Sequence, residues 1–192
     1  MIEIKPETTS EFKQYNFIHP ELLTHPNIPK PLHGLNPRSI LGNEWWDYQR
    51  KVTYAKNNYC CWACGVHKSI AKYHPWIEAH ETYKYDFEKG EAKLIEIVAL
   101  CHSCHNYIHD GRMQMMVQSG EMGEDKFLDI KRHGDKIIDM NDLFAQKYAN
   151  SHPFKVADWN KWHIIIGNKS YYSKFKDFGE WKDFYANLPE SR

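Results

Sequence analysis

Apolar residues recur at helical spacing in the segment that follows Asn43, and Asn43 itself is well suited to cap a helix N-terminus. The apolar residues that share one helical face are Trp45, Tyr48, Val52 and Ala55. The spacing predicts a helix over 44–56 that packs this face into the core.

Two stretches of strand-like composition, 76–83 and 92–100, flank a connection that ends in Lys89-Gly90-Glu91. Glycine beside polar residues is typical of a turn, so the pattern predicts a β-hairpin. A helix follows the second strand, and the pair Asp110-Gly111 is of the type that ends a helix. Four further elements are predicted beyond it: helices at 124–133, closed by Gly134, and at 135–149, a hairpin that turns at Gly167-Asn168, and a short helix at 179–187.

Proline concentrates near the N-terminus, where residues 1–42 hold six of the nine prolines. Proline lacks an amide donor and disfavours helix in the residue before it, so this stretch is predicted to form an extended arm. The chain therefore divides into three parts. These are the Pro-rich arm 1–43, a core at 44–112, and a region at 113–192 whose helices, hairpin and last short helix pack on the core.

Composition excludes several classes of protein. The chain has 192 residues, of which 42% are apolar and 15% aromatic, so it can bury a core and is not disordered throughout. Lysine plus arginine equals aspartate plus glutamate at 25 each, which argues against a protein that coats nucleic acid by bulk charge. No apolar run approaches the roughly 18–20 residues that span a bilayer, and the N-terminus lacks the pattern of a secretory signal. We therefore expect a cytoplasmic protein without a membrane partner.

The five cysteines are the first chemical signal, because all of them lie between Cys60 and Cys104. Two Cys-x-x-Cys knuckles, Cys61 to Cys64 and Cys101 to Cys104, are separated by thirty-six residues. In a reducing compartment such pairs are interpreted as metal ligands before disulfides, and four thiolates make a closed tetrahedral zinc site. The spacing predicts a structural Zn²⁺ held by these four residues, with Cys60 outside the site.

Histidines predict a second, open metal site beside the zinc. His105 and His109 are four residues apart after the second knuckle, which places them on one face of a helix. His80 lies on the first predicted strand and comes near this helix once zinc pins the two knuckles together. Two other histidines are interpreted without a metal: His74 as a structural residue and His102 as an exposed residue of the knuckle.

The segment from Cys61 to Gly111 resembles the HNH, or ββα-metal, endonucleases, in the style of their bacterial and bacteriophage members. The run from Leu100 to His109 is similar to the second knuckle and helix of that family, and Ile77-Glu78-Ala79-His80-Glu81 is similar to its first strand. The resemblance implies an α+β fold, in which a small zinc-stapled ββα-metal core carries helical and extended flanking segments.

The resemblance also implies an activity, the metal-dependent hydrolysis of phosphodiester bonds in DNA. His80, His105 and, as a further ligand, His109 would hold a catalytic divalent cation such as Mg²⁺, Mn²⁺, Ni²⁺ or Zn²⁺. Glu81 would act as the general base, and Arg112 would contact the nucleic-acid phosphate. Such a hydrolase would work in a bacterial cytosol, or in that of the host if a phage encodes it, on DNA found directly or delivered by a partner protein.

Two positions depart from the family pattern and keep a second interpretation open. Glu81 stands where the family usually has a histidine base, and Glu96 stands where it usually has an asparagine. With His80 as the strand ligand, Glu81 takes the base position; with His80 as the base, Ala79 stands where a ligand should be, so we favour the first alignment. A carboxylate beside a cation tends to stay ionised, so Glu81 is also a candidate ligand. The alternative function is a non-catalytic HNH-fold zinc module that binds DNA or a protein, for example as a phage regulator.

Overall fold

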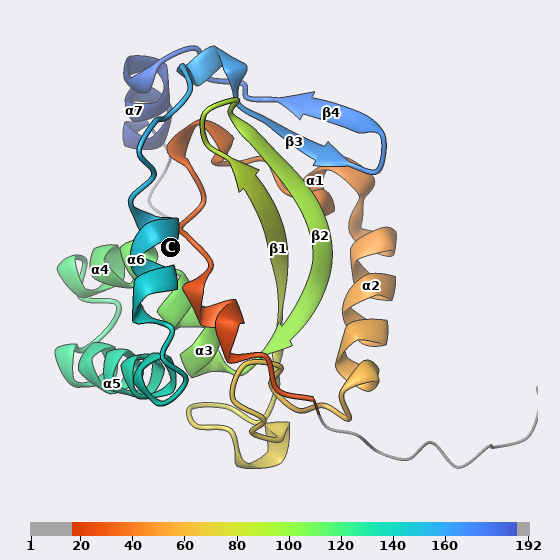
Figure 1. Ribbon diagram of the computed structural model, residues 1–192, viewed down its shortest axis with the longest axis vertical. Coiled ribbons are helices and arrows are strands. Elements are labelled where there is room, and N and C mark those ends of the chain that lie inside the picture. The colour runs from red at the N-terminus through yellow and green to blue at the C-terminus, as the bar shows by residue number, and fades with distance from the viewer. Residues whose placement is uncertain (1–16, 188–192) are drawn as a thin grey trace, which may run out of the picture.

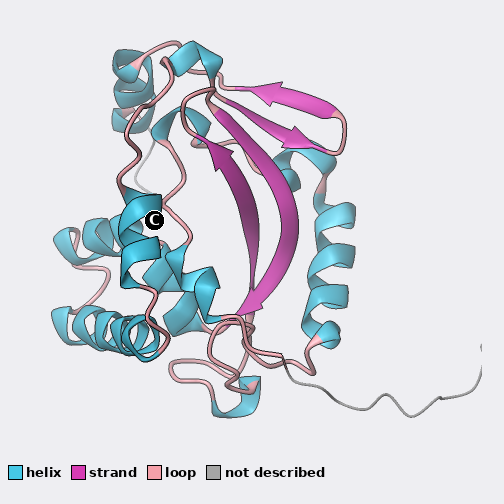
Figure 2. Cartoon of the chain, viewed as in Figure 1, coloured by secondary structure: helices cyan, strands magenta, loops and turns pink. Residues whose placement is uncertain are grey.

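The computed structural model describes residues 17–187, which form a mixed α/β fold around one four-stranded sheet (Figure 1). The strands are β1 (Glu78–Asp86), β2 (Glu91–Leu100), β3 (His163–Ile166) and β4 (Lys169–Tyr172). The seven α-helices of the described chain are α1 (Pro37–Leu41), α2 (Asn43–Lys56), α3 (His102–Ile108), α4 (Asp110–Gln118), α5 (Glu124–Met140), α6 (Phe144–Ser151) and α7 (Phe178–Ala186). Figure 2 shows the strands as one layer, with α2 along one side and α3 to α6 on the other. Within residues 17–187, no helix has the length and apolar character needed to cross a membrane.

The predicted β-hairpin is present, and its strands pair antiparallel over their whole length. Glu78 lies opposite Leu100 at one end and Asp86 lies opposite Glu91 at the other. A β-bulge after Thr82 interrupts the register, and such a bulge bends the strand that carries it. β1 itself covers 78–86, whereas the sequence predicted 76–83. The strand therefore starts two residues later than predicted and continues up to the turn.

The C-terminal hairpin extends the same sheet, which the sequence pattern did not predict. Its strands are joined at Gly167-Asn168, as expected, and Gly167 has a φ of 61°. β3 pairs parallel to the start of β2, where Ile164 lies opposite Ala92. Both residues are buried with Trp162 and with Leu32 of the N-terminal arm in a small second core. Segments from both ends of the chain thus meet at this end of the sheet.

Two predicted helix boundaries are wrong. α3 ends at Ile108, but α4 begins at Asp110, so the chain only bends where a stop was expected at Asp110-Gly111. α5 runs through Gly134, because this glycine makes room for an aromatic ring: a Cβ there would lie 2.1 Å from the ring of Tyr107. The glycine thus serves the packing of α5 on α3. The helix predicted at 135–149 is replaced by the end of α5 and by α6.

α2 confirms the helix predicted at 44–56, but the buried face is a different one. Tyr48 is 66% exposed and Val52 is 46% exposed. The buried residue of α2 is instead Thr53, and Asn57, which caps the helix, is buried beside the arm. Thr53 donates a hydrogen bond of 3.1 Å to the carbonyl of Ile97 on β2. Polar residues are stable there because they find backbone partners, and apolar spacing therefore indicated the wrong face.

The N-terminal arm is described from Phe17 onward, and the first part of the predicted arm, 1–16, lies outside the described residues. Asn57 holds the start of the described part, because its side chain accepts a hydrogen bond from the Phe17 amide and donates one to the Phe17 carbonyl, each at 3.0 Å. A 3₁₀ helix at Pro20–Thr24 then packs against α3, α5 and α6. The arm continues beside β1 towards α1, so that His25 reaches the hairpin (Figure 1).

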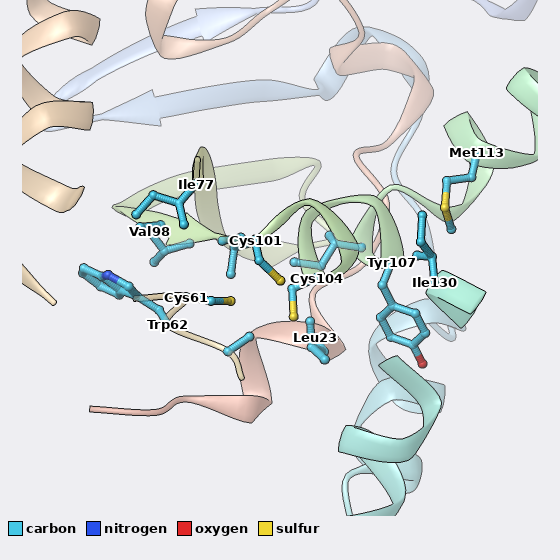
Figure 3. Close-up of a cluster of buried hydrophobic side chains, with 14 of the residues drawn as sticks. Leu23, Cys61, Trp62, Ile77, Val98, Cys101, Cys104, Tyr107, Met113 and Ile130 are labelled. Atoms are coloured by element: carbon cyan, nitrogen blue, oxygen red, sulfur yellow. The ribbon is translucent and has the colours of Figure 1, made fainter. Parts of the chain in front are cut away.

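The main core surrounds the cysteines. Figure 3 shows the sulfur atoms of Cys61, Cys101 and Cys104 pointing toward one another, with Trp62 and Leu23 nearby. Fully buried side chains of β2, α3 and α5 continue this core, among them Leu100, Tyr107 and Ile130. The knuckles are therefore part of the core and link the hairpin to the helices.

Candidate metal centres

Four cysteines form the first candidate centre. All four Sγ atoms lie within 4.8 Å of one another: those of Cys61, Cys64, Cys101 and Cys104. The first knuckle is a tight turn in which the Gly65 amide donates to the Cys61 carbonyl at 2.8 Å, and the second is the junction of β2 and α3. A 2.8 Å hydrogen bond from the Trp62 amide to the Ala99 carbonyl holds the first knuckle against β2.

The spacing of the sulfur atoms fits a tetrahedral metal. In a tetrahedron with zinc–sulfur bonds of about 2.3 Å, neighbouring sulfurs are about 3.8 Å apart. The Sγ atoms of Cys64 and Cys101 are 3.8 Å apart. Cys61, Cys101 and Cys104 are buried and Cys64 is half-buried, as in a closed site. The four cysteines can therefore hold a metal such as zinc, and Cys60 is buried outside the group.

The cysteine thiols are close enough to influence one another's protonation. Hydrogen bonds from the other three, Cys101 first, lower the pKa of the Cys64 thiol, whereas hydrogen bonding with Cys101 raises the pKa of the Cys104 thiol. Zinc binds thiolates and releases their protons, so a dication suits this donor set. Nε2 of His133, on α5, lies 3.4 Å from Cys104 Sγ, a contact typical of the groups that support metal ligands.

Three histidines form the second candidate centre. His80 of β1, His105 of α3 and His109 at the bend after α3 present ring nitrogens within 4.8 Å of one another. Their ring centroids are 5.3 Å apart for His80 and His105, 5.0 Å for His80 and His109, and 4.7 Å for His105 and His109. The helical backbone aligns the last pair, since the His109 amide donates to the His105 carbonyl at 3.2 Å. The structure therefore brings together the three histidines that the sequence singled out.

His80 is the strongest sign that this centre takes a cation. It is 3% exposed, and neither ring nitrogen has a hydrogen-bond partner among the described residues. A buried polar atom without a partner costs about 1–3 kcal/mol, which a bound cation would relieve. Burial, followed by the charges of His105 and His109, lowers the pKa of His80, and burial is the main reason that the pKa of His109 falls to about 3. Both rings are therefore neutral at pH 7, the form that binds metals.

Glu78, two residues before His80, sets the orientation of His105. One oxygen of the Glu78 carboxylate, Oε2, contacts Nδ1 of His105, which leaves Nε2 of that ring for a cation. Histidines that bind metals characteristically donate their second ring N–H to a carboxylate. Although burial favours the neutral acid, hydrogen bonds from His102 and His105 hold the pKa of Glu78 below its usual value. Glu78 is thus an anion fixed beside the histidine centre.

Glu81 lies outside the groups of potential ligands that the described residues form. Side chains alternate along a strand, so Glu81 leaves β1 on the face opposite to His80. Burial raises the pKa of Glu81, and its own amide and the charge of His105 oppose this rise. Glu96, the second departure from the family pattern, is exposed on β2 and lies 3.9 Å from Lys56 in an ion pair.

Arg112 is exposed on α4, one helical turn after His109. Its charge contributes to the lowered pKa of His109, after burial and the charge of His105. An exposed cation at this position is available to an anionic ligand.

His25 is a neighbour of this centre that no local motif indicated. Its Nε2 accepts a hydrogen bond of 2.9 Å from the Tyr83 amide, and its ring centroid lies 5.4 Å from that of His80. Its Nδ1 is buried, without a hydrogen-bond partner in the described chain. Burial lowers the pKa of His25 to about 4. The sequence gives no signal for this contact, because the arm and the hairpin are far apart along the chain.

His74 and His102 join Glu78 in a third group of potential ligands. The expectation that His102 is exposed is wrong, because its side chain is only 16% exposed. The ring of His102 packs edge-on against Tyr73 and His74, with centroids 5.4 Å and 4.6 Å away. The loop before β1 therefore covers the second knuckle.

Comparisons of the chain with protein-family models, with curated proteins and with solved structures find no match. The function is therefore inferred from the side chains of the two candidate centres and from the hairpin and helix that hold them.

Proposed function

We propose that the chain is a metal-dependent endonuclease of the HNH, or ββα-metal, type, which hydrolyses phosphodiester bonds in DNA. The observation that carries the proposal is the convergence of His80, His105 and His109 from the first strand and the following helix of a β-hairpin–helix unit. The contact of Glu78 with His105 supports it, because it frees one defined nitrogen for a cation.

The four cysteines would have a structural role in this enzyme. A zinc ion bound by Cys61, Cys64, Cys101 and Cys104 would join the loop before β1 to the start of α3. Metal binding at such a site contributes on the order of 10 kcal/mol to folding at neutral pH. It would keep His105, which directly follows Cys104, in register with His80 on the hairpin.

The histidine centre would hold the catalytic cation through His80, His105 and His109. A divalent cation bound there would supply Lewis-acid chemistry, which neutralises charge on the phosphate and on the leaving oxygen. Glu78 would keep His105 in its ligand orientation. The guanidinium of Arg112, exposed near His109, would bind a phosphate oxygen and orient the substrate.

In the alignment that makes His80 a ligand, Glu81 would be the general base, and it would have to reach the attacking water from the strand face opposite to His80. Burial raises the pKa of Glu81, which is the direction that makes a carboxylate a better base. The alignment in which His80 is the base has less support, since His80 shares the ligand cluster with His105 and His109.

A second candidate function is a non-catalytic zinc module that binds DNA or a protein, for example as a phage regulator. Two observations favour it. Glu81 emerges on the strand face opposite to His80, and His80 itself is 3% exposed, which limits access to one ligand. In this alternative the histidine centre would stabilise the fold and would carry out no chemistry.

A cleavage and binding assay with supercoiled plasmid DNA distinguishes the nuclease from the non-catalytic binding module. The protein is incubated with plasmid in Mg²⁺, Mn²⁺, Ni²⁺ or EDTA, and nicked and linear DNA are measured together with DNA binding. The nuclease predicts nicking in at least one metal and none in EDTA. Binding without nicking in every metal would instead support the binding module.

A further inference from the structure

Three atoms from His74, Glu78 and His102 form a nearly equilateral triangle beside the histidine centre. Nε2 of His74 is 2.8 Å from Oε1 of Glu78 and 2.9 Å from Nδ1 of His102. Nδ1 of His102 is 3.0 Å from the same Glu78 oxygen. The side chains are mostly buried, with exposures of 11% for His74, 23% for Glu78 and 16% for His102.

With both rings neutral, protons alone do not satisfy this triangle. Nδ1 of His74 faces the carbonyl of Trp76 at 3.2 Å, and the tautomer that donates there turns a lone pair of Nε2 toward the Glu78 carboxylate. If both rings donated to Glu78 instead, two N–H groups would be pressed together on one oxygen. The other nitrogen of His102, Nε2, is buried and has no partner among the described residues. A cation on one side of the triangle, out of its plane, would be bound by all three atoms at once.

We propose that His74, Glu78 and His102 form a second cation site, which binds an octahedral first-row divalent metal of the Mn²⁺ and Fe²⁺ class. With bonds of about 2.1 Å, neighbouring ligands lie about 3.0 Å apart in an octahedron but about 3.4 Å apart in a tetrahedron. The observed edges of 2.8, 2.9 and 3.0 Å match one face of the octahedron. Two histidines and one carboxylate on such a face leave three positions open, an arrangement that suits Fe²⁺ and related ions.

This site goes beyond the proposed nuclease centre, and it stands whether or not the chain cleaves DNA. It is nonetheless joined to that centre, because Glu78 offers Oε1 to the triangle and Oε2 to His105. A cation in the triangle would fix the carboxylate that orients His105. Because the two centres share Glu78, occupancy of the triangle is expected to change the metal affinity of His80, His105 and His109, and occupancy of that centre to change the affinity of the triangle by the same factor.

The test counts Mn²⁺ on protein whose four cysteines already hold zinc. Manganese prefers nitrogen and oxygen ligands to thiolates, so it reports on the two other centres. Free Mn²⁺ is measured by electron paramagnetic resonance during titration of the full chain. We expect two bound Mn²⁺ per chain for the wild type and for the control His152→Ala, which changes an exposed histidine on α6's C-terminal side.

His74→Ala and His102→Asn should each bind one Mn²⁺ fewer, and zinc content and circular dichroism verify that these variants are folded. His80→Ala should lose the other ion, and His74→Ala combined with His80→Ala should bind none. The proposal is overturned if folded His74→Ala binds as many Mn²⁺ ions as the wild type, or if the wild type binds none. Absence of DNA nicking with the expected Mn²⁺ count would remove the nuclease function and leave this site in place.

Discussion

Glu78 on β1 contacts Nδ1 of His105 on α3, and this contact joins the first strand of the hairpin to the helix that follows it. It fixes which nitrogen of His105 faces the other two histidines. It also places the partly buried carboxylate of Glu78 next to the histidine cluster, and this negative charge favours a cation there. The relationship between these two residues therefore decides how well the histidine centre can bind a metal.

Replacement of Glu78 tests this role. Glu78→Gln keeps the size of the side chain but removes its charge, and we expect metal affinity at His80, His105 and His109 to fall about 10- to 100-fold, as for other groups that support metal ligands. Isothermal titration with Mn²⁺ or Ni²⁺ measures this affinity on zinc-loaded proteins that all carry His74→Ala, so that the triangle of His74, Glu78 and His102 does not contribute. Glu96→Gln, on the exposed side of β2, is the matched control and should leave it unchanged. Equal affinities for both variants would mean that Glu78 does not support the metal.

Removal of the metal from the four cysteines should unfold the chain. Binding energy on the order of 10 kcal/mol is comparable to the whole stability of a domain, about 5–15 kcal/mol. We therefore expect Cys104→Ser, or strong chelation of the wild type, to abolish cooperative thermal unfolding measured by circular dichroism. Cys60→Ser is the matched control, because Cys60 is buried but lies outside the cluster. It should retain one zinc per chain, and a loss of zinc in this variant would contradict the proposed ligand set.

A substitution at Gly134 shows whether close packing or helix propensity determines which residue α5 tolerates there. Alanine is a better helix former than glycine by about 1 kcal/mol, but a Cβ at Gly134 would lie 2.1 Å from the ring of Tyr107. We expect Gly134→Ala to lower the free energy of unfolding by about 1–3 kcal/mol, the range for overpacked cores. Gly111→Ala on α4, where nothing lies within 4 Å, should leave stability unchanged or slightly higher. Urea unfolding of both variants measures the difference, and a stabilised Gly134→Ala would mean that the two helices pack less closely.

Much of the candidate site follows from local sequence, whereas its surroundings do not. The Cys-x-x-Cys spacing and the separation of His105 and His109 are fixed by one turn of backbone, so the sequence predicts them directly. The β1–β2 pairing is also local, and it carries His80 to α3. Local rules failed where a distant partner decides the outcome: Gly134 accommodates Tyr107, and the buried face of α2 is polar because Thr53 bonds to Ile97.

The contacts of the N-terminal arm also could not be predicted from local sequence. His25 reaches Tyr83, 58 residues away, and no periodicity in a proline-rich segment predicts such a contact. The parallel pairing of β3 with β2 likewise depends on the burial of Trp162 and Ile164 against Leu32. These contacts join segments that are far apart in the sequence, so a motif of a few residues does not predict them.

The burial of His25 predicts a dependence of stability on pH. Burial lowers the pKa of His25 from 6.5 to about 4 in the folded chain, so the unfolded chain binds a proton more readily at this residue. The resulting stability is fully present above pH 6.5 and is lost as the pH falls to about 4, with a total of about 3 kcal/mol. His25→Gln, which retains an acceptor for the Tyr83 amide, should show a shallower loss between these pH values. Urea unfolding at pH 7.5, 6, 5 and 4 measures both slopes, and parallel curves would contradict a neutral, buried His25.

The rate at which His105→Ala nicks supercoiled plasmid, compared with the wild type and with His152→Ala, tests the central proposal most directly. All three proteins are first shown to hold one zinc per chain, so that folding is equal, and the rates are measured at saturating Mn²⁺ or Mg²⁺. A metal held by His80, His105 and His109 predicts that His105→Ala is slower by about three orders of magnitude, the scale for removing one group that stabilises the transition state. His152→Ala should nick at the wild-type rate. Equal rates for His105→Ala and the wild type, or nicking that persists in EDTA, would contradict a nuclease that works through this histidine centre.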